Sequence, residues 1–145
     1  MLKISSYVAY FSQKLLIAPK KVMVIDDEPD IVAAIERALE SHGYSTGAFT
    51  NPERAVEEIR SNSKAYALVI SDIRMPGMNG FDLARNIRVI NPGMPLVFMT
   101  AFEIHKSEFS SLFPSTSVAE LVAKPFTNAQ MIGIVRKYAG ITETL

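Results

Sequence analysis

The sequence predicts an α/β protein in which a five-stranded parallel sheet is covered by helices on both faces. The first observation is that short apolar runs, such as Val22–Ile25 and Ala67–Ile70, alternate with longer segments of helical hydrophobic spacing. The second is that proline, glycine and asparagine fall between these segments, where turns are expected. The third is that four of the apolar runs end in an acidic, hydroxyl or amine side chain. Strands that are apolar throughout are typical of parallel sheets buried on both faces.

The expected elements alternate along the chain. The apolar runs predict strands at 22–25, 44–49, 66–71, 95–99 and 120–123. We expect Asp30 to cap the first helix, Asn51 and Pro52 to open the second, and Thr127 to cap the last. Two further helices are expected at 81–90 and 102–112, and serines dilute the apolar positions of the second of these.

Composition excludes several classes of function. The chain has 145 residues, enough for one domain with its own core. Its formal net charge is zero, so no overall field draws it to nucleic acid or to anionic lipid. It contains no cysteine, which excludes disulfides and thiolate chemistry and fits a reducing cytoplasm. No apolar stretch approaches the roughly 20 residues that a membrane-spanning helix needs.

Residues 1–19 stand apart from the alternating pattern. They carry Lys3 and Lys14 without an acidic residue, and Pro19 marks a boundary before the first strand. We interpret them as an N-terminal extension that forms a tail. A helix that packs on the domain or on a partner is the second interpretation, and membrane targeting is a distant third.

The polar residues that end the apolar runs predict a functional site. Carboxyl ends of neighbouring parallel strands meet at one edge of the sheet, where open α/β sheets bind their ligands. This edge gathers three carboxylates, one hydroxyl and one ammonium group, from Asp26, Asp27, Asp72, Thr100 and Lys124. Adjacent carboxylates repel unless a cation neutralises them, and hard oxygen ligands suit Mg²⁺. A carboxylate beside such a metal can attack phosphorus and form an acyl phosphate.

Each of these residues also has an ordinary structural explanation. Asp26 and Asp27 fit a solvated turn before a helix, where acidic residues are favourable. Asp72 fits a loop acid that caps a backbone turn, and Lys124 fits a lysine at the rim of the sheet. A threonine such as Thr100 is common at strand ends. The functional interpretation therefore depends on the ordered set and not on any single residue.

That ordered set resembles the receiver domain of two-component response regulators. The resemblance spans roughly Lys20 to Ala139, and the matching stretches are Val24-Ile25-Asp26-Asp27-Glu28-Pro29, Ser71-Asp72-Ile73-Arg74-Met75-Pro76-Gly77-Met78-Asn79-Gly80, Thr100-Ala101 and Lys124-Pro125-Phe126. The Asp-x-x-Met-Pro-x-Met-x-Gly pattern within them is far more specific than a lone glycine-rich loop.

The resemblance implies a doubly wound, flavodoxin-like (βα)5 fold with strand order 2-1-3-4-5. The receiver domain would occupy residues 20–140, between the extension and a short C-terminal tail at 141–145. Asp72 would accept the phosphoryl group, and Thr100 and Lys124 would bind it. The Mg²⁺ ligands would be Asp26, Asp27, Asp72 and the backbone carbonyl of Arg74.

The resemblance also implies the partners. In this family the phosphoryl donor is a histidine kinase or a phosphotransfer protein, and the receiver catalyses its own phosphorylation and slow autodephosphorylation. We therefore expect a cytoplasmic signalling protein and not an enzyme of metabolism. Phosphorylation would change the surface formed by 102–112, 120–123 and the last helix, and so its contacts with a downstream protein. A phosphorylation-linked homodimer is a further hypothesis.

Two other functions stay open at this point. Leu121 stands where many family members carry an aromatic residue that moves with the threonine. This departure is weak support for a degenerate receiver that never carries phosphate, and the complete acidic set argues against one. A haloacid-dehalogenase-type phosphatase is the other alternative, but it requires Asp-x-Asp where this chain has Asp26-Asp27-Glu28. The short segment after the last helix favours a stand-alone receiver, with a receiver cut from a longer regulator as the alternative.

Overall fold

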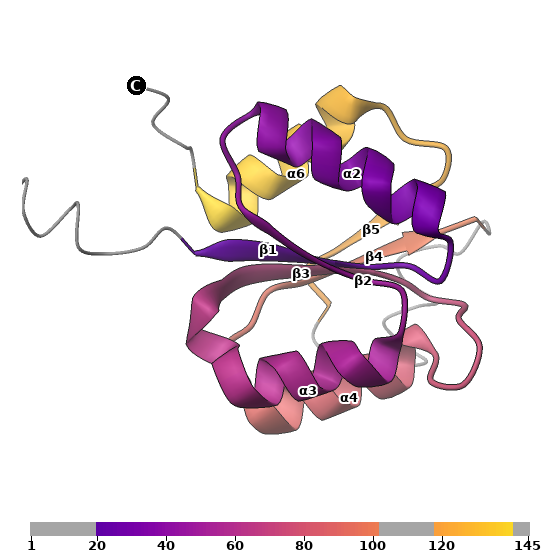
Figure 1. Cartoon of the computed structure of the whole chain (residues 1–145), viewed down its shortest axis with the longest axis vertical. Helices are drawn as coiled ribbons and strands as arrows, with labels where there is room; N and C mark the ends of the chain where they lie inside the picture. Colours follow the sequence, from indigo (N-terminus) through magenta and orange to yellow (C-terminus); the bar gives the residue numbers. More distant parts are fainter. Residues whose placement is uncertain (1–19, 102–117, 141–145) are drawn as a thin grey trace, which may run out of the picture.

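The computed structural model describes residues 20–101 and 118–140, which build one parallel sheet (Figure 1). Its five strands run in the order β2-β1-β3-β4-β5, as expected, and every neighbouring pair is parallel. The strands are β1 (Lys21–Ile25), β2 (Thr46–Phe49), β3 (Tyr66–Asp72), β4 (Leu96–Thr100) and β5 (Glu120–Ala123). All of their carboxyl ends therefore meet at one edge of the sheet.

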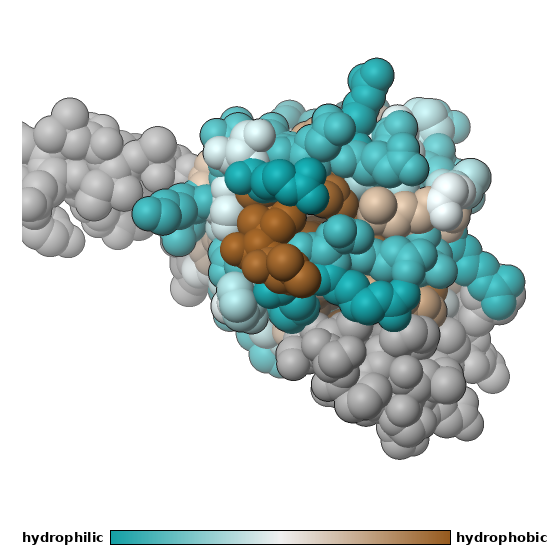
Figure 2. All heavy atoms as spheres, turned by 90° about the horizontal axis from the view of Figure 1, so that it is seen from below, coloured by the Kyte–Doolittle hydropathy of each residue, from teal (hydrophilic) through white to brown (hydrophobic). Residues whose placement is uncertain are grey.

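Helices cover both faces of this sheet. Figure 1 shows α2 (Pro29–Ser41) and α6 (Asn128–Ala139) on one face, and α3 (Pro52–Asn62) and α4 (Gly80–Ile90) on the other. A short 3-10 helix, η1 (Ser63–Ala65), links α3 to β3. The helix expected at 102–112 lies outside the described residues. Figure 2 shows the outer surface of the α3 and α4 layer as mainly hydrophilic, with one compact hydrophobic patch.

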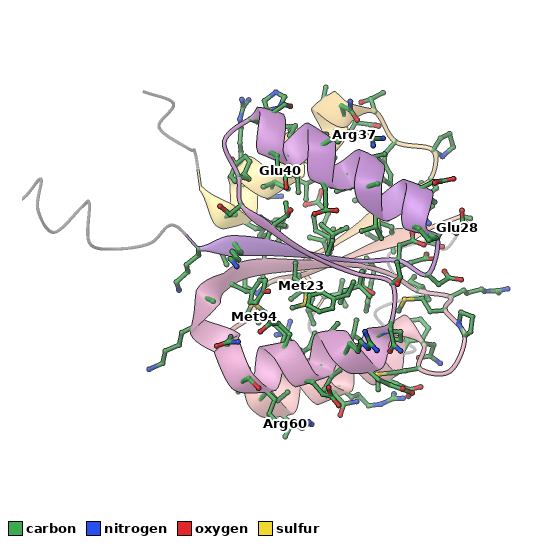
Figure 3. The ribbon with its side chains drawn as sticks, viewed as in Figure 1. Met23, Glu28, Arg37, Glu40, Arg60 and Met94 are labelled. Carbon is green, nitrogen blue, oxygen red and sulfur yellow. The ribbon has the colours of Figure 1, made fainter. Side chains whose placement is uncertain are left out.

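The sheet separates two hydrophobic cores. Successive side chains of a strand point to opposite faces, so Met23 packs with α3 and α4 while Val22 and Val24 pack with α2 and α6. Figure 3 shows Met23 and Met94 between the sheet and the α3–α4 layer. Each large apolar side chain that is fully buried stabilises the fold by about 1.5–3 kcal/mol. These two cores hold the strand ends at fixed positions relative to one another.

Side-chain caps begin two of the helices as the sequence predicts. The Asn51 side chain accepts hydrogen bonds from the backbone N–H groups of Glu53 and Arg54 at the start of α3. At the start of α6, Thr127 and Gln130 form a reciprocal capping box, in which each side chain accepts from the backbone of the other. Caps of this kind are worth about 1 kcal/mol each.

Two predicted element starts are wrong by two residues, and the other described boundaries differ by one residue at most. Helix α2 begins at Pro29, so Glu28 occupies the cap position that the sequence analysis gave to Asp30. The reason is that proline presets the backbone for the first helical position and needs no N–H partner there. Strand β2 begins at Thr46 instead of Tyr44. Tyr44 is buried in the loop before it, and its hydroxyl donates to the carbonyl of Gly140 at 2.6 Å.

Candidate functional site: an acidic cluster at the strand ends

The strand ends bring the predicted site residues to one edge of the sheet. Asp26 directly follows β1, Asp72 ends β3, Thr100 ends β4 and Lys124 directly follows β5. The registers keep these ends level, because Ile25 pairs with Ser71 and Thr100 pairs with Ala123. Parallel pairing therefore brings residues that are far apart in sequence together at this edge.

Three carboxylates form the centre of this group of residues. One oxygen each from Asp26, Asp27 and Asp72 lies within 4.8 Å of the other two. Asp26 is fully buried, Asp72 is nearly so, and Asp27 is partly exposed. The backbone N–H of Glu28 donates to Asp26 Oδ1 at 3.0 Å, which fixes one carboxylate oxygen. The oxygens that remain are hard donors at a spacing that one small divalent cation can bridge, so the residues fit Mg²⁺.

Lys124 supplies the positive charge of the cluster. Its Nζ lies 2.8 Å from Asp26 Oδ2 and 3.5 Å from Asp72 Oδ1. Burial lowers the pKa of Lys124, but the hydrogen bond and charge of Asp26, together with Asp72, outweigh burial and hold it above its ordinary value. Lys124 therefore stays an ammonium. One ammonium faces three carboxylates, so the cluster keeps an excess of negative charge.

Asp72 is buried beside this excess of negative charge. Burial and the charge of Asp26 raise the pKa of Asp72, while Lys124 and the backbone N–H of Ile73 lower it by less. The Ile73 N–H donates to Asp72 Oδ1 at 3.0 Å, which orients the carboxylate. A cation at the cluster would lower the pKa of Asp72, because it favours the ionised carboxylate that can act as a nucleophile.

The loop after Asp72 is packed tightly against the strand end. The N–H of Gly80 donates to the carbonyl of Ile73 at 2.7 Å. A Cβ at Gly80 would lie 2.8 Å from the carbonyl oxygen of Asp72 and 2.9 Å from the Cα of Ile73. Only glycine fits there without moving the backbone of Asp72. Gly77, with φ of +80°, provides the turn within the same loop.

Thr100 lies on the neighbouring strand and is buried at its carboxyl end. Its position beside β3 follows from the pairing of Asp72 with Met99. Arg74, whose backbone carbonyl the resemblance assigns to the metal, is exposed and lies two residues after Asp72 in the loop. Asp26, Asp27, Asp72 and Lys124 thus gather directly, and Thr100 and Arg74 lie on the elements that border them.

Two features of this edge were not anticipated from the sequence. Lys124 lies nearer to Asp26 than to Asp72, and no spacing in the sequence indicates that order. An apolar cavity of about 570 Å³ opens beside Lys124, with Ile31, Ile35 and Phe126 in its lining. The only indication in the sequence is that Ile31 and Ile35 share a helix face.

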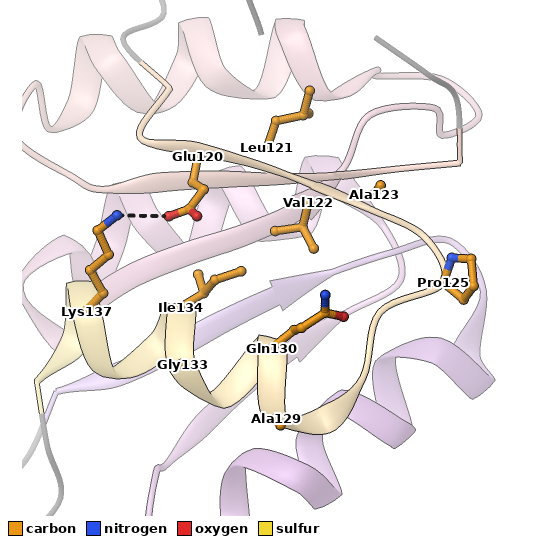
Figure 4. Close-up of a pocket in the computed structure, with 10 residues that line it drawn as sticks. All are labelled: Glu120, Leu121, Val122, Ala123, Pro125, Ala129, Gln130, Gly133, Ile134 and Lys137. Carbon is orange, nitrogen blue, oxygen red and sulfur yellow. Dashed lines mark hydrogen bonds and ion pairs between the residues drawn. The ribbon is translucent and has the colours of Figure 1, made fainter. Parts of the chain in front are cut away.

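Leu121, at the position of the expected aromatic residue, lies in β5. It is partly buried against the core between the sheet and the α3–α4 layer. It also lines a groove of about 490 Å³ between β5 and α6 (Figure 4). At one end of the groove Lys137 forms an ion pair with Glu120, at 3.5 Å. This groove differs from the acidic cluster in its charge balance, because its one acid and its one lysine form an ion pair.

Comparison with known proteins identifies the class. Residues 22–136 match the model of the response regulator receiver domain. The chain belongs to this family, whose members are signalling proteins of two-component systems.

The relatives are both short and long proteins. The chain is 29% identical over 118 residues to the response regulator receiver protein CpdR of Brucella abortus, covering 81% of this chain and 95% of CpdR. It is 31% identical over 121 residues to the C4-dicarboxylate transport transcriptional regulatory protein DctD of Rhizobium meliloti, covering 83% of this chain. The chain spans only 25% of the length of DctD.

Solved structures agree with this assignment. The response regulator protein TrrA of Thermotoga maritima, in complex with Mg²⁺ and BeF, is 32% identical and superposes with a TM-score of 0.71 over 82% of this chain and 98% of TrrA. A receiver domain protein from Clostridium thermocellum is 27% identical, with a TM-score of 0.73 over 83% of this chain and 94% of that one. Within residues 20–101 and 118–140, no helix has the length and apolar character that crossing a membrane requires.

Proposed function

We propose that this chain is a phospho-accepting receiver module of a two-component phosphorelay, with Asp72 as the acceptor. The observation that carries the proposal is the meeting of Asp72 with two further carboxylates and Lys124 at the carboxyl edge of the sheet. An Asp72 oxygen would attack the phosphorus of the donor, and the product would be an acyl phosphate on that side chain. The module would occupy residues 20–140, between the extension at 1–19 and the tail at 141–145.

Mg²⁺ would be held by Asp26, Asp27 and Asp72, together with the backbone carbonyl of Arg74. The spacing of the three carboxylates supports this assignment, as does the Mg²⁺ complex of TrrA. When bound, the ion would offset the repulsion between the acids and an incoming phosphoryl group. Asp26 would hold the Lys124 ammonium beside Asp72 through their contact at 2.8 Å.

Thr100 and Lys124 would bind the transferred phosphoryl group and transmit its arrival. Lys124 lies 3.5 Å from Asp72 Oδ1 before transfer, so a dianionic group on Asp72 would compete with Asp26 for its ammonium. A shift of Lys124 would move the end of β5, and with it the surface that β5 shares with α6. The donor would be a histidine kinase or a phosphotransfer protein, and the phosphorylated form would act through protein contacts until slow autodephosphorylation.

The test is direct phosphorylation. The protein is incubated with Mg²⁺ and acetyl phosphate, and its intact mass is measured beside that of Asp72→Asn. We expect one labile phosphoryl group on the parent chain and none on the variant. If the parent chain stays unmodified both with acetyl phosphate and with a phosphorylated histidine phosphotransfer protein, a degenerate receiver that works without phosphate is favoured instead.

A further inference from the structure

An apolar cavity lies directly beside the proposed acceptor site, between α2 and the segment that follows β5. Its volume is about 570 Å³. Ile35 is buried at its lining, Ile31 and Phe126 are partly exposed in it, and Ala34 is exposed. A hollow of this size with an apolar lining favours an apolar ligand group, since burying such surface releases water from it.

Lys124 connects this cavity to the acidic cluster. It lines the cavity, and its Nζ is also 3.5 Å from Asp72 Oδ1. Ala101, another lining residue, directly follows Thr100 at the end of β4. A small donor whose phosphoryl group meets Asp72 and Lys124 would therefore have its remaining part at the opening of the cavity. Lys124 offers positive charge to the phosphoryl group, and Ile31 and Phe126 offer apolar surface to the acyl chain. Asp30 and Asn128 are the other polar residues of the lining.

We propose that this cavity seats the alkyl chain of small acyl-phosphate donors, so that the protein reacts faster with butyryl phosphate than with acetyl phosphate. The inference rests on the proposed phosphoryl transfer to Asp72. In that step an Asp72 oxygen forms a bond to phosphorus, the bond from phosphorus to the acyl oxygen breaks, and the bonding pair leaves with a carboxylate. No proton, oxidant or further reactant is needed.

The size of the preference follows from the two additional methylene groups of the butyryl chain. Complete burial of one methylene favours binding by about fourfold, so two give about sixteenfold when fully buried and about tenfold when part of their surface stays exposed. Butyrate and acetate are leaving groups of closely similar basicity, so the chemical step itself does not separate the two donors. A faster reaction with butyryl phosphate would therefore report binding of its chain.

The experiment compares second-order rate constants for phosphorylation of the full chain by the two donors, with Mg²⁺ and below saturation. The test variant is Ala34→Leu, which adds side-chain volume at an exposed cavity position without disturbing the core. The matched control is Ala129→Leu, which makes the same change at an exposed position of α6 that lines the other groove (Figure 4). Melting temperatures establish that each variant is folded.

We expect a rate ratio of about tenfold in favour of butyryl phosphate for the parent and for Ala129→Leu, and a ratio near one for Ala34→Leu. Equal rates for the parent would overturn the inference while leaving phosphorylation of Asp72 intact. A preference that survives in Ala34→Leu would show that the chain binds elsewhere, which also overturns it. Absence of phosphorylation by both donors would also overturn the inference, and only together with absence of phosphorylation by a histidine phosphotransfer protein would it mean that the proposed function has failed.

Discussion

Two lysine–carboxylate contacts in this protein have similar chemistry and different surroundings. Lys124 meets Asp26 at 2.8 Å, and these side chains are 16% and 0% exposed. Lys137 meets Glu120 at 3.5 Å, and these side chains are 63% and 31% exposed (Figure 4). The buried lysine faces an excess of acids, whereas the exposed lysine faces one acid that also accepts a hydrogen bond from the Tyr138 hydroxyl. Burial with unbalanced charge, and not the ion pair itself, distinguishes the candidate site.

The largest expected effect comes from one glycine near each ion pair, Gly80 beside the acidic cluster and Gly133 in the β5–α6 groove. Gly80→Ala would press a methyl group against the backbone of Asp72 and Ile73, so we expect a loss of about 3 kcal/mol in the free energy of unfolding. Gly133→Ala in the β5–α6 groove meets nothing within 4 Å and should stabilise α6 by about 0.8 kcal/mol. Urea denaturation of both variants measures the difference. Equal stability of the two variants would contradict the tight packing of Gly80 against the backbone of Asp72 and Ile73.

Removing each lysine in turn tests the comparison itself. Lys124→Met leaves the buried Asp26 carboxylate without its ammonium partner, so we expect a loss of about 2 kcal/mol in the metal-free protein. Lys137→Met should leave the melting temperature nearly unchanged, because water and salt already screen its exposed contact. Thermal melts of both variants at low and high salt provide the measurement. A loss as large in Lys137→Met as in Lys124→Met would remove the distinction between the two regions.

Magnesium should stabilise only the unbalanced cluster. At a free concentration ten times its dissociation constant, Mg²⁺ raises the free energy of unfolding by about 1.4 kcal/mol, since it binds the folded chain. Asp27→Asn should weaken this effect and Glu120→Gln should preserve it. Melting temperatures across a Mg²⁺ titration report both outcomes, and an equal response in the two variants would place the ion elsewhere.

The smallest expected effect is a pH-dependent gain in the metal-free protein. The pKa of Asp72 is raised above its ordinary value of 3.8, chiefly by burial and then by Asp26, so the folded chain binds this proton more tightly than the unfolded chain. The stability that this group contributes is present below pH 3.8 and is lost as the pH rises through the folded pKa. At pH 7 Asp72→Asn should therefore have the higher melting temperature, and its advantage should vanish as the pH falls toward 3.8.

A matched series with Glu120→Gln gives the control for this pH effect. Glu120 accepts from both Lys137 and Tyr138, so its replacement removes favourable contacts and should give no gain at pH 7. If Asp72→Asn is instead less stable than the parent at pH 7 without metal, the excess negative charge at the cluster is already neutralised by groups of the protein.

Much of this fold and site could be predicted from the sequence, because the residues that end parallel strands must lie at the same edge of the sheet. Asp72 and Lys124 each end an apolar run, and parallel pairing alone brings such ends to one edge. The start of α2 was misplaced because Asp30 is a good capping residue, while Pro29 decides where the helix begins. The contact of Lys124 with Asp26 and the cavity beside Ile31 depend on how α2 packs against the segment after β5, and no local sequence pattern specifies this packing.

The most direct measurement locates the phosphoryl group. The protein is treated with a small acyl phosphate, with and without Mg²⁺, and the acyl phosphate is reduced with borohydride, which converts a phosphorylated aspartate to homoserine. Peptide mass spectrometry then identifies the converted position. We expect conversion at Asp72 alone and only when Mg²⁺ is present. Conversion at Asp26 or Asp27, or conversion that is independent of Mg²⁺, would contradict an acceptor that works through the acidic cluster.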